Sequence, residues 1–371
     1  MRAEAPVPSE VLSAIRRPLA EAGAVMLDVP VLQPLALLLD LAGEAMRPRL
    51  FVVQSEGGEE AALRPDFTIP VARAHIADGA RAGRYAYEGK AFRAAGATPR
   101  AEEFLQMGLE SYGDADPVAA EIQMVVLAWK AALAGGRSDL ELVLGDVSLF
   151  AALIDDLALA PALTARLKRA FGRPRLLLAE LDTEAPNKAA PESRLAGLLA
   201  GLPEAEAVIL LEEVWALAGV SPVGGRPALE IARRLAARHD EGASARLSRL
   251  ESAQVQRFLA IQGPLPAALD NLEALGGPRL STSLALWRQR LALLAAAGVP
   301  VSEARFEAGF GRAFSYYDGP LFEVRSQTLG EDRPLAAGGR YDLLIPRLGG
   351  QAVGAVGCMV RPARAFAGSG E

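Results

Sequence analysis

The chain has 371 residues, of which 51% are hydrophobic and 23% charged, so it has the composition of a folded protein with a large core, not of a disordered or fibrous one. Its formal net charge of −6 argues against a large nucleic acid as the main partner, because such binding depends on lysine and arginine neutralising phosphates, although it permits a local basic patch. The single cysteine, Cys358, excludes an internal disulfide and fits a reducing compartment such as the cytoplasm, and no run of about 18 uninterrupted apolar residues predicts a membrane span.

The first third of the chain predicts helices alternating with strands. Apolar residues recur at helical spacing from Ser9 to Gly23. In segments 84–93 and 104–112, apolar and polar residues alternate with period two, so these segments predict an antiparallel pair joined by a polar loop. The other elements expected here are a strand over 24–29, a hairpin over 50–64 that turns at Gly57 and Gly58, and a helix over 69–80.

The remaining chain predicts a sheet interrupted by a block of helices. The order of segments, with strands before and after an alanine- and leucine-rich helical stretch, is typical of an α+β fold. The expected elements are a helix over 117–134, a strand over 140–144, a helix over 281–297, and strands over 304–310, 321–325 and 352–360. We expect a discontinuous core of residues 1–148 and 277–366, a helical insertion domain of residues 149–276, and a tail of residues 367–371.

Residues that could carry covalent or metal chemistry are scarce. The two histidines, His75 and His239, lie far apart and have no second ligand one helical turn away, so no metal site is predicted. We favour a structural role for His75, and we expect Cys358 to pack within an apolar strand. Because the sequence also lacks a phosphate loop, a dinucleotide fingerprint and a nucleophile elbow, we expect no cofactor and no catalytic residue of these kinds.

Polar residues gather on one face of the strand at 104–112. Period two places Gln106, Gly108 and Glu110 on one face and apolar residues on the other. Exposure to water would explain the polar side chains, but a glycine inside a strand often marks the close approach of a ligand. On the neighbouring strand, small residues likewise lead to Arg93. The two strands predict a small pocket for a zwitterionic ligand, with a carboxylate such as Glu110 facing its cationic part.

Several ordered motifs resemble those of histidyl-tRNA synthetases, which belong to class II of the aminoacyl-tRNA synthetases. The segment Leu63 to Thr68 reads LRPDFT and resembles the LRPEGT segment of that family. The further matching segments are Tyr87 to Arg93 (motif 2), Phe104 to Gly113, Arg312 to Tyr317 (RAFSYY), Ala337 to Asp342 (AGGRYD) and Gly354 to Arg364 (motif 3). The resemblance covers most of residues 9–148 and 280–366 and implies an antiparallel sheet flanked by helices.

The resemblance also implies a nearly intact histidine-binding pocket. An arginine suits the ligand's carboxylate, and a carboxylate opposite a phenol suits a ring with two nitrogens. The alternative interpretations are core packing for Tyr316 and Tyr317 and a local turn pair for Arg340 and Asp342. The implied roles are Asp66, Thr68 and Gln106 for the α-ammonium group, Arg312 for the carboxylate, Glu110 and Tyr317 for the imidazole nitrogens, and Tyr341 as a lining residue.

The ATP side departs from the synthetase pattern. Motif 2 continues as Ala94-Ala95-Gly96 in place of an acid and a second arginine, and the aspartate of the RGLDYY segment is Ser315. The arginines that remain on the phosphate side are Arg93 and Arg364. Class II activation depends on neutralising the phosphates in line with the attacking carboxylate, so we expect no adenylation by these arginines alone. The sequence stops just after motif 3, so no anticodon-binding domain is expected.

This combination resembles the regulatory-subunit family of ATP phosphoribosyltransferase, the first enzyme of histidine biosynthesis. The resemblance implies a non-catalytic protein that supports the short-form catalytic subunit, binds L-histidine for feedback inhibition, and forms a homodimer within a hetero-oligomer without tRNA. A stand-alone synthetase-like enzyme that adenylates histidine or another amino acid is the main alternative, and a scaffold with a vestigial pocket is a third interpretation. The departures in motif 2 favour the first interpretation over the second.

Overall fold

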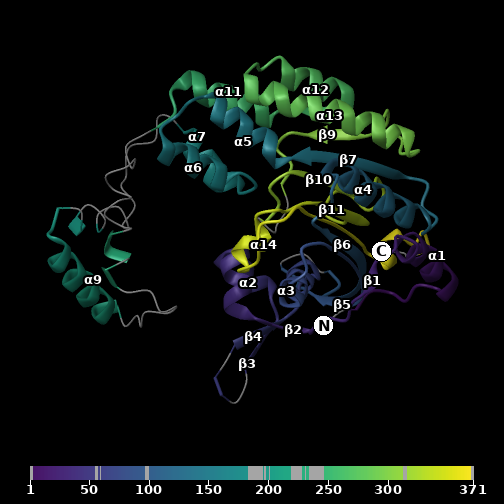
Figure 1. The fold of residues 1–371 in the computed structure, drawn as a ribbon, viewed down its shortest axis with the longest axis horizontal. Coiled ribbons are helices and arrows are strands. Elements are labelled where there is room, and N and C mark those ends of the chain that lie inside the picture. Colours follow the sequence, from purple (N-terminus) through teal and green to yellow (C-terminus); the bar gives the residue numbers. More distant parts are fainter. Residues whose placement is uncertain are drawn as a thin grey trace. The chain divides into compact units, whose positions relative to one another are not determined.

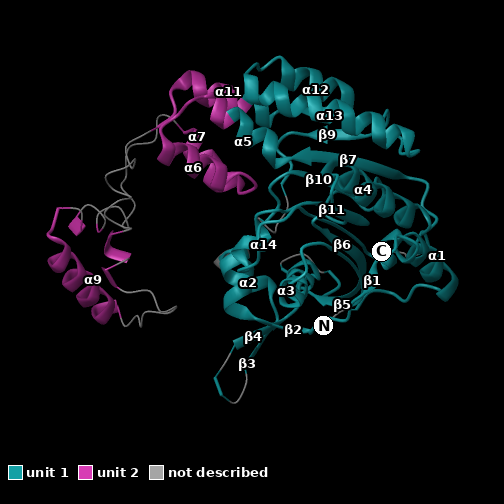
Figure 2. Ribbon diagram, in the orientation of Figure 1, with its two compact units in different colours: residues 1–153, 257–371 teal, residues 154–256 magenta. Residues whose placement is uncertain are grey.

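The chain divides into two compact units in the computed structural model (Figure 2). Unit 1 comprises residues 1–153 and 257–371, and unit 2 comprises residues 154–256. The sequence placed the corresponding boundaries at 148 and 277. The residues that the structure describes are 3–54, 57–58, 60–96, 100–182, 195, 198–199, 201–218, 228–229, 231–233, 246–311 and 316–368.

Two sheets form the centre of unit 1 (Figure 1). The strands are β1 Val25–Met26, β2 Leu32–Pro34, β3 Val52–Gln54, β4 Glu60–Leu63, β5 Gly83–Phe92, β6 Glu103–Tyr112, β7 Leu140–Asp146, β8 Gln262–Pro264, β9 Arg305–Glu307, β10 Pro320–Ser326, β11 Ala336–Arg340 and β12 Ala355–Val360. Among the described residues, the larger sheet has nine strands in the order β1-β5-β6-β12-β11-β10-β7-β9-β8, and the smaller has the order β2-β4-β3. The β1–β5 and β7–β9 pairs are parallel and the others are antiparallel, so the sheet is mixed but mostly antiparallel.

Helices of unit 1 pack around these sheets. Their bounds are α1 Ser9–Ala20, α2 Leu35–Ala42, the 3-10 helix η1 Glu44–Arg49, α3 Thr68–Asp78, α4 Pro117–Leu133, α5 Val147–Asp156, α11 Arg249–Leu259, α12 Leu265–Glu273, α13 Pro278–Ala296, α14 Leu344–Arg347 and α15 Pro362–Ala365, with α5 and α11 crossing the boundaries of unit 2. Helix α4 begins where its sequence predicts, because the Asp116 side chain accepts hydrogen bonds from the amides of Val118 and Ala119 and Pro117 occupies the first turn. None of the helices among the described residues is long and apolar enough to cross a membrane.

Most of the elements predicted for unit 1 are confirmed. The pair β5–β6 runs antiparallel in continuous register from Gly83 opposite Tyr112 to Phe92 opposite Glu103, which agrees with the period-two pattern. The hairpin β3–β4 and the helices α3, α4 and α13 lie within a few residues of their expected positions. The sequence did not predict helix α2 or strand β11. Strand β11 reads AAGGR, which carries little strand signal, and it forms between β10 and β12.

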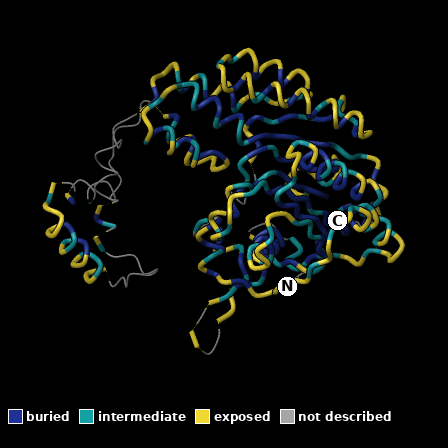
Figure 3. Tube along the Cα trace, viewed as in Figure 1, coloured by how far each residue is buried: buried dark blue, intermediate teal, exposed yellow. Residues whose placement is uncertain are grey.

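Helices α3 and α4 cover opposite faces of the large sheet. Arg84 of β5, whose register partner is Ser111, donates a hydrogen bond to Gln123 of α4. The next residue of β6, Tyr112, points to the other face, where His75 of α3 stacks on it with ring centroids 4.3 Å apart. The strands between these layers are largely buried (Figure 3). The face that carries Gln106 and Glu110 is therefore the α3 face.

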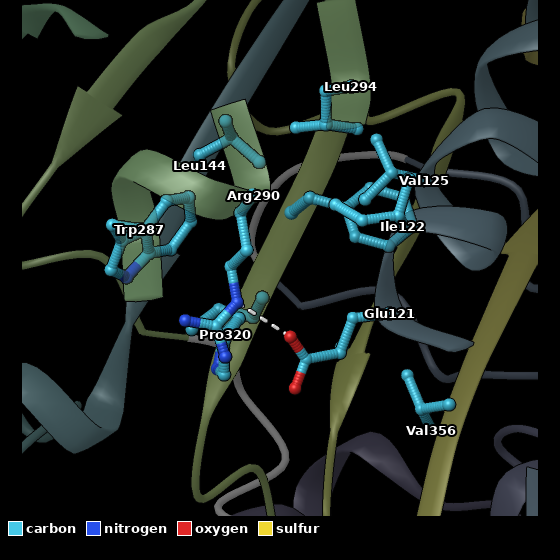
Figure 4. A pocket seen from close by; sticks show the side chains of 12 residues that line it. Glu121, Ile122, Val125, Leu144, Trp287, Arg290, Leu294, Pro320 and Val356 are labelled. Carbon is cyan, nitrogen blue, oxygen red and sulfur yellow. Dashed lines mark hydrogen bonds and ion pairs between the residues drawn. The ribbon is translucent and has the colours of Figure 1, made fainter. Parts of the chain in front are cut away.

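A buried ion-pair network joins α4, α13 and β11. Glu121 of α4 accepts a hydrogen bond from Arg290 of α13 at 2.6 Å (Figure 4). It also accepts one from Arg340 of β11. Arg340 also pairs with Asp342 at 2.9 Å, as in the turn-pair interpretation, and donates to the Pro117 carbonyl. Two cations share one carboxylate, so the network ties three elements of unit 1 together.

The described part of unit 2 is helical. Its helices are α6 Pro161–Ala170, α7 Pro174–Leu181 and α9 Glu204–Ala218. A small apolar cluster includes Ala207 and Leu211 of α9 together with Leu199 and Ala232. The bidentate pair of Arg166 with Glu180, at 2.8 Å, links α6 to α7.

Candidate functional site

A small cavity lies on the α3 face of strands β6, β12 and β11. Its empty volume is about 350 Å³. Helix α3 contributes its first residue, Thr68, and strand β6 contributes Gln106 and Glu110. The full lining is Asp66, Thr68, Tyr87, Arg93, Gln106, Glu110, Tyr316, Tyr317, Ala337, Gly338, Gly357, Cys358 and Met359.

Glu110 is the central polar group of this cavity. It is almost fully buried, and its two carboxyl oxygens accept hydrogen bonds from Thr68 Oγ1 at 2.8 Å and from the Tyr341 hydroxyl. Burial raises the pKa of Glu110 to about 8, against the two hydrogen bonds that lower it. The carboxyl group is therefore mostly protonated at neutral pH and can donate a proton to a ligand.

Asp66 and Gln106 are two further buried polar side chains in the lining. The Tyr316 hydroxyl donates to Asp66 Oδ2 at 3.4 Å, and Gln106 Nε2 donates to the Tyr87 hydroxyl at 3.4 Å. The Gln106 Oε1 atom is buried and accepts no hydrogen bond from any residue that the structure describes. A buried acceptor without a donor costs free energy, so a donor from a ligand would stabilise this arrangement.

Glycine gives Glu110 its space, although not at the position that the sequence indicated. A Cβ added to Gly357 of β12, the register partner of Glu110, would lie 1.6 Å from Glu110 Oε2. At Gly108, which the sequence pattern associated with ligand approach, a Cβ would lie 2.2 Å from the Tyr87 hydroxyl and 2.3 Å from the Cys358 carbonyl. The prediction that Gly108 makes room for a ligand is wrong. Tyr87 and the backbone of β12 fill the space beside Gly108.

The structure brings together most of the residues predicted for the pocket. Asp66, Thr68, Gln106, Glu110 and Tyr317 line the cavity. Tyr341 does not line it but lies behind Glu110 and contacts it, with its ring 6.2 Å from that of Tyr317. Arg312 lies outside the described residues. Tyr87 also lines the cavity, and sequence reasoning did not assign it to the site.

A second, wider cavity adjoins the first on the same strands. Its empty volume is about 1250 Å³, and Arg93 and Met359 line both cavities. We call it the arginine pocket, because its lining includes Arg49, Arg93, Arg100, Arg361 and Arg364 with three acids, Glu323, Glu331 and Asp332. The predicted phosphate-side residues Arg93 and Arg364 are both in it. Arg361, which the sequence did not propose as a site residue, also lines the pocket, and besides burial the charges of Arg364 and Arg93 both lower its pKa.

Two arginines of this pocket are held in unfavourable surroundings for a cation. Arg361 is 4% exposed, and its guanidinium lies 3.5 Å from the centroid of the Phe104 ring. Burial and the neighbouring arginines lower the pKa of Arg361 to about 9, and burial foremost lowers that of Arg364 to about 10. Both remain charged at neutral pH, so the pocket has an excess of positive charge that an anion would relieve.

The other titratable side chains that the sequence drew attention to lie outside both linings or serve as packing. His75 is buried, with Nδ1 3.2 Å from the Tyr85 hydroxyl, and desolvation lowers its pKa. Cys358 is buried in β12, and burial raises its pKa. His239 lies outside the described residues. Within the described ranges, no three His, Cys, Asp or Glu side chains gather closely enough to hold a metal ion.

Comparison with known proteins connects this geometry to a family. A model of the histidyl-tRNA synthetase family matches residues 3–223 and 208–364. The solved structure of an ATP phosphoribosyltransferase regulatory subunit/histidyl-tRNA synthetase from Bacillus halodurans superposes with a TM-score of 0.64 at 23% identity, covering 99% of this chain and 82% of that one. Histidyl-tRNA synthetase from Nostoc sp. PCC 7120 gives a TM-score of 0.58 at 15% identity, covering 97% and 74%. These two similarities show the class II synthetase fold.

Curated relatives define the family more narrowly. ATP phosphoribosyltransferase regulatory subunits from Brucella canis and Brucella suis are each 37% identical to this chain over 372 residues, with 98% of both sequences covered. The similarity therefore extends over the whole core and through the segment between its two halves. The chain belongs to the family of ATP phosphoribosyltransferase regulatory subunits, and its fold is that of the histidyl-tRNA synthetases.

Proposed function

We propose that this chain is a non-catalytic regulatory subunit that assembles with a short-form ATP phosphoribosyltransferase catalytic subunit in the cytoplasm. In this role it supports the first step of histidine biosynthesis and takes part in feedback inhibition by binding L-histidine in the Glu110 cavity. The name shared by relatives that match along nearly the whole chain supports the assembly. The chemistry of the cavity supports the ligand.

The observation that carries the ligand proposal is a buried, protonatable acid in a small polar cavity. Glu110 holds a proton up to about pH 8, and an imidazole nitrogen is a group that can accept it. The resulting pair of a carboxylate and an imidazolium is strong because it is desolvated. Tyr317 lies on the same lining and would contact the second ring nitrogen.

The polar atoms near Asp66 suit the other end of the ligand. An α-ammonium group has three donors, and Asp66, the Gln106 carbonyl oxygen and Thr68 are acceptors on one side of the cavity. We propose that Arg312 binds the ligand's carboxylate, as the resemblance implies.

The arginine pocket supports a role without adenylation. The loop that would carry the acid and second arginine of motif 2 is Ala94-Ala95-Gly96, and these small residues line the pocket without charged atoms. Catalysis of phosphate chemistry by positioning and electrostatics needs both the acid and the second arginine. We therefore propose regulation and not catalysis, with histidine shifting the assembly between states of different activity.

Titration calorimetry with L-histidine tests the ligand. We expect the wild-type chain to bind histidine and the Glu110→Gln variant to bind about 100-fold more weakly, because the shared proton and its charge are lost. Glu103→Gln is the matched control, since Glu103 lies on the same strand but forms a partly exposed pair with Lys90. Equal affinity of all three proteins would exclude Glu110 from the site.

Reconstitution tests the regulatory role. A complex of this chain with a short-form catalytic subunit should be active and inhibited by histidine, and the Glu110→Gln complex should keep its activity and lose most of the inhibition. Histidine-dependent exchange of pyrophosphate into ATP by the isolated chain would instead support the stand-alone enzyme. If histidine inhibits the wild-type and Glu110→Gln complexes equally, the result would support a scaffold with a vestigial pocket.

A further inference from the structure

Two separate segments carry the tyrosines around Glu110. Tyr316 and Tyr317 line the cavity, and they lie in a stretch that is neither helix nor strand, just ahead of β10. Tyr341, which donates to Glu110, follows β11 directly. The ring centroids of Tyr316 and Tyr317 lie 5.7 Å and 6.2 Å from that of Tyr341. The cavity therefore keeps its shape only if the two segments keep their relative position.

Asp318 joins these two segments through three hydrogen bonds. It follows the two lining tyrosines in the sequence, and its carboxylate accepts hydrogen bonds from the amides of Asp342 at 3.2 Å and Leu343 at 2.6 Å. Its own amide donates to the Arg340 carbonyl at 3.1 Å. These partners precede and follow Tyr341 in the sequence, so Asp318 binds the turn on both sides of the tyrosine that contacts Glu110.

The turn that Asp318 binds is fixed to the rest of unit 1. Arg340 forms ion pairs with Glu121 and Asp342 in the buried network. Asp342 Oδ1 also accepts a hydrogen bond from the Ala355 amide of β12 at 2.8 Å. By contrast, residues 316–319 have no helix or strand of their own. Asp318 therefore positions the lining tyrosines relative to the turn, and not the reverse.

The surroundings of Asp318 disfavour its negative charge. Burial foremost raises the pKa of Asp318 to about 6, and the charge of Asp342 acts in the same direction, against the two amides and Arg340. At pH 7 the group is still mainly charged. Because its pKa is higher in the folded chain than in the unfolded one, stability is lost as pH rises toward neutrality. This loss favours a role for Asp318 in positioning over a role in stability.

We propose that Asp318 is a positioning residue of the Glu110 cavity, which holds the two lining tyrosines against the turn of Tyr341 and raises ligand affinity without touching the ligand. The inference rests on the proposed binding of L-histidine. Asp318 is not among the residues that line the cavity. A site residue binds well only when its supporting contacts hold it in place, so loss of these hydrogen bonds should loosen the contact of Tyr317 with the ligand.

Titration calorimetry of the full-length chain with L-histidine tests the proposal. We expect Asp318→Ala to bind histidine about tenfold more weakly than wild type, because the lining tyrosines lose their anchor. Asp116→Ala is the matched control, since the Asp116 carboxylate also accepts hydrogen bonds from two backbone amides, at the start of α4 on the other face of the sheet. Both variants lose a carboxylate of this kind, but only Asp318→Ala should lose histidine affinity.

A conservative variant grades the response. Asp318→Asn keeps one side-chain oxygen that can accept an amide, so its histidine affinity should lie between those of wild type and Asp318→Ala. It also replaces Asp318→Ala in the comparison if melting curves show that the alanine variant does not fold. Histidine affinity equal to that of wild type in the folded variants overturns the proposal, as does an equal loss in Asp116→Ala.

A measurement without ligand separates this proposal from the assignment of histidine. Tyr316 is buried, and tetranitromethane nitrates exposed tyrosines, so peptide mass spectrometry can follow its exposure. We expect faster nitration of Tyr316 in Asp318→Ala than in wild type or Asp116→Ala, with Tyr341 unchanged. If wild type binds no histidine, the proposed function fails, and nitration alone decides whether Asp318 holds the wall. Unchanged nitration of Tyr316 overturns the positioning role.

Discussion

The cavity around Glu110 and the arginine pocket share strands β6 and β12 and two lining residues, but their charged side chains are mainly acidic in the first and basic in the second. In the cavity around Glu110, which we propose binds histidine and call the histidine cavity, burial raises the pKa of Glu110 to about 8. In the arginine pocket, burial lowers the pKa values of Arg361 and Arg364 to about 9 and about 10. In both places desolvation opposes the charged form, because the protein around the group is a poorer solvent for charge than water.

The difference lies in where the opposite charge comes from. The histidine cavity contains two buried acids, Glu110 and Asp66, so in the proposed complex the opposite charge is a cation brought by the ligand. Beside the arginine pocket, the chain itself supplies a carboxylate, because Glu4 forms an ion pair with Arg361. One cavity thus has no counter-charge from the chain, and the other does.

Substitution of one glycine should break the histidine cavity and leave the arginine pocket intact. In Gly357→Ala, the new Cβ would lie 1.6 Å from Glu110 Oε2, so the carboxyl group must move. We expect histidine affinity to fall about 100-fold, since charge-assisted hydrogen bonds worth about 3 kcal/mol are lost. The free energy of unfolding should fall by about 2–3 kcal/mol from overpacking, as measured by urea titration.

The matched control for that glycine lies three residues earlier. A Cβ on Gly354 would approach only Arg340 Nη1 among its close neighbours, at 3.4 Å, which is an acceptable contact. Gly354→Ala should bind histidine like wild type. An equal loss of histidine affinity in both alanine variants would show that the close approach of Gly357 to Glu110 is not the cause.

Removing the charge of Glu110 should stabilise the protein in alkaline solution. The folded chain keeps the Glu110 proton up to about pH 8, whereas the unfolded chain releases it near pH 4.5, so the stability falls as pH rises through this window and levels off above it. Glu110→Gln lacks this fall. We expect this variant to be on the order of 2 kcal/mol more stable than wild type at pH 8. The gain is smaller than the full difference between the folded and unfolded pKa implies, because an amide nitrogen cannot accept the hydrogen bond from Tyr341.

Urea unfolding at pH 5 and pH 8 checks this expectation. At pH 5 the unfolded chain is itself about a quarter protonated at Glu110, so little of the pH-dependent loss has built up, and Glu110→Gln should be no more stable than wild type. A stability difference of the same size at both pH values would show that packing, not the proton, separates wild type from Glu110→Gln.

Removing the charge of Glu4 should have the opposite effect on stability. Glu4→Gln leaves Arg361 and Arg364 without their shared carboxylate, and both are largely buried. We expect the free energy of unfolding at pH 7 to fall by about 1.5 kcal/mol, within the range for losing a partner of a buried charge that can partly relax toward a cavity. Glu10→Gln should stay within about 0.5 kcal/mol of wild type. A more stable Glu4→Gln would remove the contrast between the pockets.

The sequence predicted local features well and long-range ones poorly. The pair β5–β6 follows from alternation within each segment, and the position of Gln106 and Glu110 on one face follows from the same alternation. Strand β11 was missed, because two alanines and two glycines carry no strand preference and its neighbours in the sheet determine its conformation.

The site residues divide in the same way. Residues in family motifs could be proposed from the sequence, and five of the predicted pocket residues line one cavity. Glu4 could not be predicted, since its partner Arg361 is 357 positions away and nothing near Glu4 in the sequence indicates a contact. A glycine inside a strand, such as Gly108, can make room either for a ligand or for a neighbouring side chain. The register with β5 places Tyr87 opposite Gly108 and shows that the side chain is the cause, but this pairing cannot be seen in the sequence.

The dependence of histidine affinity on pH gives the finest test of the Glu110 assignment. In the proposed complex, Glu110 and the imidazole ring share one proton. Free Glu110 carries that proton below about pH 8, and free imidazole acquires its own below about pH 6.5. Between these values the two free partners together carry one proton, so binding needs no net proton uptake or release and should be tightest there.

Outside that window a proton must be gained or lost on binding. Above pH 8 the pair has lost its proton, and affinity should weaken by up to about tenfold per pH unit; below about pH 6.5 it carries two, and affinity should weaken again. Calorimetry across pH 5.5 to about 9.5 measures both limbs. Glu110→Gln has no proton to lose at this site, so its affinity, though weaker, should lack the decline that wild type begins near pH 8. Because the ligand's own groups titrate identically with both proteins, a decline that is equally steep in the variant would assign the alkaline limb to histidine and not to Glu110.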